Sequence, residues 1–91
     1  MNTLKSLEWK TVKNIAIKVK VVLSDERHYL VQIIKQNGDY YCDIMNDWYE
    51  TLDIKCAKTP LQTIKLLGDF WQCDFKALVD VALDIEHINE E

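Results

Sequence analysis

The stretch YLVQIIKQNGDYYCDIM, residues 29–45, decides the fold because it holds two strand-like runs joined by Asn37-Gly38. Asn-Gly between apolar runs is typical of a two-residue hairpin with a type I′ turn, whose central residues both need positive φ. Glycine reaches positive φ at no steric cost, and asparagine reaches it more easily than most residues do. With these two residues in the loop, Gln36 faces Asp39, and this pairing fixes the register of the whole hairpin.

This register gives the hairpin one apolar face and one mixed face. The apolar face carries Tyr29, Val31, Ile33, Tyr40, Cys42 and Ile44. The mixed face carries Leu30, Gln32, Ile34, Tyr41, Asp43 and Met45. A slip of one residue would exchange the two faces, so the turn and the alternation together support a single register. We therefore expect the apolar face to pack on a core and the mixed face to be partly wet or to meet a partner.

Residues 14–23, NIAIKVKVVL, predict a further strand, because apolar and mostly β-branched residues alternate along them. The apolar residues of this strand must lie on the same face as the apolar residues of the hairpin. When the strand pairs antiparallel with the first strand of the hairpin, this requires that the numbers of two paired residues sum to an even number near 52. The polar segment that follows the strand then forms a loop of five residues. In this arrangement Lys18 and Lys20 point to the same face as Asp43.

The remaining extended segments are less well defined. We expect the third strand to run from about Asp39 to Met45 or a little further, and the alternation of residues 52–58 is compatible with a short fourth strand. Residues 2–12 are compatible with a short helix capped by Asn2 or Thr3, although their apolar residues fit a helical stripe poorly.

Two helices are expected after the strands. Thr59 can cap the first as its N-cap, Pro60 suits the first helical position, and Gln62 completes a capping box. The second is expected from about Asp74 to Ile88, with a wide apolar face. The fold class is therefore α+β: an antiparallel meander of three strands, or four, packed against two C-terminal helices in a single domain spanning residues 1–91.

Composition is that of a folded domain, with 48% hydrophobic and 29% charged residues. No run approaches the roughly 18 apolar residues that a membrane span needs, and the N-terminus lacks the apolar core of a signal peptide. Three widely spaced cysteines argue for reduced thiols rather than a disulfide framework. These features predict a cytoplasmic protein.

Charge is distributed unevenly along the chain. Residues 1–35 hold seven basic and three acidic residues, a net of +4, whereas residues 36–91 hold four and twelve, a net of −8. The segment 39–53 contains no lysine or arginine but concentrates aromatic and acidic side chains. Tyrosine and tryptophan are enriched in binding hot spots, and nearby carboxylates steer basic partners. The predicted partner-binding residues are Asp39, Tyr41, Asp43, Asp47, Trp48, Tyr49, Glu50 and Asp53. The competing interpretation is that some of these rings complete a small core.

Other site chemistries have weaker support. Asp80, Asp84 and His87 align on one helix face, but an exposed acidic face is common. No local motif supports a thiol nucleophile or a zinc site built from a cysteine (Cys42, Cys56 or Cys73) and a histidine (His28 or His87). Lys18, Lys20, Arg27 and Tyr29 resemble an RNA-binding sheet surface, but the acidic second half of the chain opposes that use. The sequence contains no phosphate-binding loop or hydrolase motif, and no cofactor or metal is expected.

The function expected from these features is a small acidic, non-catalytic protein-binding module. By analogy of class alone, such a protein masks a basic surface of a larger protein, such as a nucleic-acid-binding enzyme. Phage-borne or mobile-element inhibitors, immunity proteins and antitoxins belong to this class. The alternatives are a homodimer formed through the mixed sheet face and, less favoured by the charge, a sheet that binds RNA.

Overall fold

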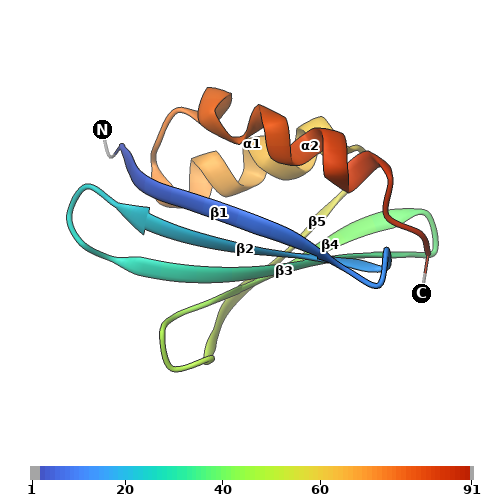
Figure 1. The fold of residues 1–91 in the computed structure, drawn as a ribbon, viewed down its shortest axis with the longest axis horizontal. Coiled ribbons are helices and arrows are strands. Elements are labelled where there is room, and N and C mark those ends of the chain that lie inside the picture. The colour runs from blue at the N-terminus through green and yellow to red at the C-terminus, as the bar shows by residue number, and fades with distance from the viewer. Residues whose placement is uncertain (1–2, 91) are drawn as a thin grey trace.

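The computed structural model describes residues 3–90, which form a five-stranded antiparallel sheet with a layer of helices on one side (Figure 1). The strands are β1 (Leu4–Val12), β2 (Ala16–Leu23), β3 (His28–Gln36), β4 (Asp39–Met45) and β5 (Thr51–Ala57). The helices are α1 (Pro60–Trp71), the 3₁₀ helix η1 (Phe75–Leu78) and α2 (Val79–Glu86). Each strand pairs with the next one in the chain, so the sheet is a simple meander. The α+β class is confirmed, with more strands than predicted.

The central hairpin has the predicted register. Gln36 pairs with Asp39 and Ile33 with Cys42, while Asn37 and Gly38 adopt φ values of 54° and 80° as a type I′ turn requires. Between β2 and β3 the numbers of paired residues sum to 50, as in Val19 opposite Val31. The predicted parity is therefore right, and the connecting loop is one residue shorter than expected because His28 belongs to β3.

The prediction of a helix over residues 2–12 is wrong, because Leu4–Val12 form strand β1. Lys13 and Asn14 both have positive φ, 53° and 58°, and they turn the chain back so that β1 pairs with β2. Along β1, Leu7 and Trp9 both pack against the core. Their spacing of two residues is the period with which side chains return to the same face of a strand. Asn2, named as an alternative cap, lies outside the described residues.

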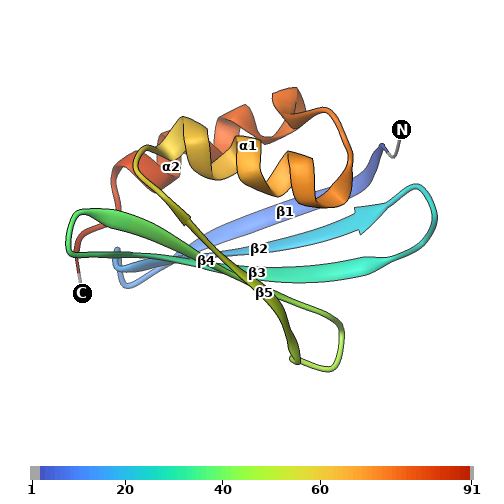
Figure 2. The ribbon, with the colours of Figure 1, turned by 180° about the vertical axis from the view of Figure 1, so that it is seen from behind.

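The core lies between the sheet and the helices, as the view from behind also shows (Figure 2). The apolar face predicted for the β3–β4 hairpin is buried in it. From the helical layer, Trp71 is among the largest fully buried side chains, and its ring lies 5.7 Å from that of Tyr29. Burial of this face at about 25 cal/mol per Å² of apolar surface is the main stabilising contribution.

Helix α1 begins as predicted. Thr59 Oγ1 accepts a hydrogen bond from Gln62 N at 3.1 Å, and Gln62 Oε1 accepts one from Lys58 N at 2.7 Å. The Gln62 side chain thus serves the residue before the N-cap rather than the N-cap itself. Gly68 lies inside α1, where its missing Cβ lets Phe75 approach the helix backbone.

The second predicted helix begins close to its expected residue but in another form. Asp74 caps a 3₁₀ turn by accepting from Lys76 N, and the α-helical part runs only from Val79 to Glu86. Neither α-helix in the described residues is long and apolar enough to cross a membrane.

Candidate binding surface

The turn between β4 and β5, residues 46–50, is held by a set of hydrogen bonds centred on Asn46. Its Oδ1 accepts from Trp48 N at 2.9 Å and from Glu50 N at 3.1 Å. Its backbone N donates to Glu50 O and its backbone O accepts from Tyr49 N, both at 3.1 Å. The Asn46 side-chain amide also donates to Glu50 Oε1. Since one side-chain oxygen satisfies two backbone N–H groups, the turn has a defined conformation.

This turn, which we call the aromatic turn, holds two large rings in solvent. Trp48 is 81% exposed and Tyr49 is 74% exposed. Tyr49 has φ of 61°, an uncommon value for a residue with a Cβ. The adjoining strand β5 adds Leu52 and Ile54, which are also exposed. Four of the exposed large apolar side chains therefore belong to one hairpin.

The eight predicted site residues are divided between the two faces of the sheet. Asp39, Tyr41 and Asp43 lie on the face opposite the helices, which we call the open face, because they alternate with the buried residues of β4. Asp47, Trp48, Tyr49 and Glu50 lie in the aromatic turn. Asp53 pairs with Ile44 and so faces the helical side, away from the others. The predicted set is one segment in sequence but not one surface.

Two of the predicted carboxylates are neutralised within the protein. Asp39 forms an ion pair with Lys58 at 2.9 Å, which raises the pKa of that lysine. Asp53 pairs with Lys55 at 3.0 Å, and hydrogen bonds from Lys55 and Ile54 N hold its pKa below the ordinary value. These acids are less available to a partner than the sequence suggested.

The other three carboxylates form no ion pair within the described residues. Asp43 accepts a hydrogen bond from the neutral hydroxyl of Thr51 at 2.9 Å. Glu50 is bonded to the amide of Asn46. Asp47 is exposed and makes no hydrogen bond or ion pair within residues 3–90. Three carboxylates without an ion-pair partner therefore lie in or beside the aromatic turn, and one of them, Asp47, lines a shallow hollow together with Arg27.

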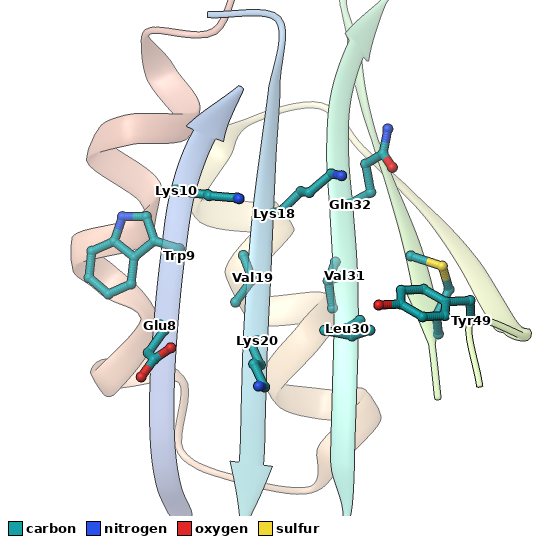
Figure 3. Close-up of a pocket in the computed structure, with 11 residues that line it drawn as sticks. Glu8, Trp9, Lys10, Lys18, Val19, Lys20, Leu30, Val31, Gln32 and Tyr49 are labelled. Carbon is teal, nitrogen blue, oxygen red and sulfur yellow. The ribbon is translucent and has the colours of Figure 1, made fainter. Parts of the chain in front are cut away.

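A groove of about 530 Å³ runs along the open face beside this turn (Figure 3). Tyr49 and Met45 form one wall, with Leu30 and Gln32 near the middle. The other side carries side chains of β1 and β2, namely Glu8, Lys10, Lys18 and Lys20. Sequence reasoning placed Lys18 and Lys20 on this face but missed Lys10, since β1 was not recognised as a strand.

The groove places two of its three lysines opposite each other and the third opposite a carboxylate. Lys10 and Lys18 are direct cross-strand partners, and Lys20 stands opposite Glu8. None of the three lysines forms an ion pair with a carboxylate in the described part of the chain. Like charges directly opposed on a sheet are destabilising, so an anionic group bound here would relieve repulsion.

The weaker site predictions find little geometric support. Tyr29 of the RNA-binding set is buried in the core, and Arg27 is paired with Asp25. Burial raises the pKa of Cys42 to about 12, so this thiol is not a nucleophile at neutral pH. Asp84 is hydrogen-bonded to Trp9. No three potential metal ligands cluster anywhere among residues 3–90.

The arrangement thus offers exposed contact area and charge on one side of the molecule. Rigid aromatic side chains supply the contact area, and the carboxylates of the turn and the lysines of the groove supply the charge. Comparison with known proteins adds no assignment to this reading, since no family model, curated protein or solved structure matches the chain.

Proposed function

We propose that this chain is a small acidic, non-catalytic protein-binding module whose anchor is the aromatic turn. The observation that carries the proposal is that two adjacent large rings are held in solvent by a hydrogen-bonded turn. Exposed tryptophan and tyrosine contribute nothing to the core, whereas in an interface they bury a large area for little lost side-chain entropy. A turn that is already ordered lowers the entropic cost of binding further.

The proposed partner is a protein with a basic surface. Asp43, Asp47 and Glu50 flank the rings without internal counter-charges, so they attract a basic surface and orient it during encounter. The matching class of function is inhibition by masking, as in immunity proteins, antitoxins and phage or mobile-element inhibitors of nucleic-acid-binding enzymes. The cytoplasm is the proposed location of this encounter.

The test is capture of a partner by the immobilised protein from lysate of its native host, followed by measurement of Kd with the purified partner. Trp48→Ala combined with Tyr49→Ala should weaken binding at least a hundredfold, as expected for the loss of two hot-spot rings. The matched control is Leu61→Ala combined with Leu83→Ala, since these two exposed apolar residues lie in the helical layer. Circular dichroism should show an unchanged fold in both variants.

Charge is tested separately. Asp47→Lys combined with Glu50→Lys should slow association and reduce its dependence on salt, because screening acts on exposed charges. Asp69→Lys combined with Asp80→Lys, which reverses two exposed acids in the helices, is the control. A partner that is acidic, or that binds the ring-deleted variant as tightly as the wild type, would refute the proposal.

A further inference from the structure

The surface around the groove carries charges of both signs, with carboxylates in the aromatic turn and lysines on β1 and β2. Its acidic half is the aromatic turn, which projects from the sheet on the side away from the helices (Figures 1 and 2). The lysines lie across the groove on β1 and β2, where Lys10, Lys18 and Lys20 line it (Figure 3). A protruding turn that carries carboxylates, with Tyr49 in the wall of the groove, therefore lies beside a groove that carries lysines.

The two halves also lie at a similar level along the strands. Lys20 pairs with Leu30, and Leu30 pairs with Met45, so the three residues form one row across the sheet. The aromatic turn begins directly after Met45. A two-fold axis parallel to the strands, in front of the open face, keeps each residue at the same position along the strand direction. It places the β1 edge of one copy opposite the β5 edge of the other. Such an axis would bring the turn of one copy to the lysines of another.

We propose that a second copy of this chain occupies the groove, in a two-fold dimer in which each aromatic turn lies against the other copy's lysines. The contact is isologous, so it occurs twice and closes the assembly as a dimer. Asp47 and Glu50 of one copy supply carboxylates to Lys18 and Lys20 of the other, neither of which forms an ion pair within the described residues. Trp48 and Tyr49 are withdrawn from water in the same step.

The inference shares a surface with the proposed function but does not depend on its being correct. If both hold, the dimer hides the aromatic turn, and a basic partner must compete with the second copy for it. Binding to the partner would then weaken as the concentration of the free protein rises, because more of it is dimeric.

The test is a charge exchange followed by sedimentation or light scattering. The first variant, Lys18→Glu with Lys20→Glu, reverses the groove, and the second, Asp47→Lys with Glu50→Lys, reverses the turn. Each homodimer then has two repulsive contacts, so each variant alone should be monomeric at concentrations where the wild type is dimeric. Mixed in equal amounts, the variants should form a heterodimer, because both of its contacts are again complementary. Recovery of the dimer on mixing also shows that both variants are folded.

The control is Lys65→Glu with Lys76→Glu, which reverses two exposed lysines of the helical layer and should leave the dimer intact. A Kd of about 1 mM marks a very weak complex. The proposal is therefore overturned if the wild type still sediments as a monomer at a protein concentration of about 1 mM. It is also overturned if the two variants stay monomeric when mixed, or if both remain dimeric alone. Partner binding is scored separately: the groove-reversed variant keeps the aromatic turn and should bind the partner of the proposed function undiminished.

Discussion

Trp9 Nε1 donates a hydrogen bond to Asp84 Oδ2 at 2.6 Å, joining the first strand of the sheet to its last helix. Hydrogen bonds to a charged group contribute roughly 1.5–3 kcal/mol in general. This pair is only partly buried, so we expect a smaller coupling free energy of about 1 kcal/mol between Trp9 and Asp84. A double-mutant cycle of Trp9→Phe and Asp84→Ala, followed by urea unfolding, measures it. Asp80→Ala is the control on the same helix. Additivity within roughly 0.3 kcal/mol would contradict the expectation.

Gly68→Ala should destabilise the protein even though alanine favours helices by about 1 kcal/mol relative to glycine. A Cβ on Gly68 would lie 2.9 Å from Phe75 Cβ and 3.2 Å from the Cys73 carbonyl oxygen, so η1 must move away from α1. Overpacking of this kind costs roughly 1–3 kcal/mol. The free energy of unfolding should fall accordingly, and the loss should be smaller when Gly68→Ala is made in a Phe75→Gly background, which lacks the facing Cβ. A more stable Gly68→Ala protein would show that the two helices do not pack this closely.

Asn46→Ala should loosen the aromatic turn while leaving both rings in place. Trp48 N and Glu50 N lose their shared acceptor, so their amide protons should exchange with solvent much faster than in the wild type. Amide exchange followed by NMR measures this without a partner. Asp47→Ala is the control, because Asp47 makes no hydrogen bond in the described chain. Unchanged exchange in Asn46→Ala would mean that the turn does not depend on this side chain.

Cys42 should make the protein less stable at alkaline pH. Burial raises the pKa of its thiol from an ordinary 9.0 to about 12. Between these values the unfolded chain has released the proton and the folded chain still holds it, so the free energy of unfolding falls as pH rises. The slope contributed by this group is on the order of 1 kcal/mol per pH unit. Cys42→Ala should be less stable at pH 8 but lose stability less steeply above pH 9, as measured by urea unfolding. An equal slope in both proteins would refute the assignment.

The parts of the fold that sequence could predict are those with local chemical signals. Asn37-Gly38 specified the central hairpin and its register because glycine and asparagine accept positive φ. Thr59-Pro60 likewise specified where α1 begins. Strand β1 carried no such signal: its turn uses Lys13 and Asn14, and Lys13 belongs to a residue type that rarely adopts positive φ.

The candidate surface was predictable only in part, for a related reason. Sequence identified Trp48 and Tyr49 as exposed anchors or core rings, and the exposure of both could be settled only by the three-dimensional arrangement. Asp53 was grouped with them by proximity along the chain, although strand alternation places it on the other face. The basic half of the groove required the pairing of Lys10 with Lys18, which does not exist until β1 is recognised as a strand.

The simple meander order has a consequence for how the chain reaches its folded state during synthesis. Each strand pairs with its immediate neighbour, so the sheet can assemble from the N-terminus as the ribosome delivers it. The helices that cover its apolar face, residues 60–86, emerge later. Until then Ile17, Ile33 and Ile44 face water on a half-built domain. The nascent chain should therefore depend on chaperones most strongly after β5 has left the exit tunnel and before α2 has done so.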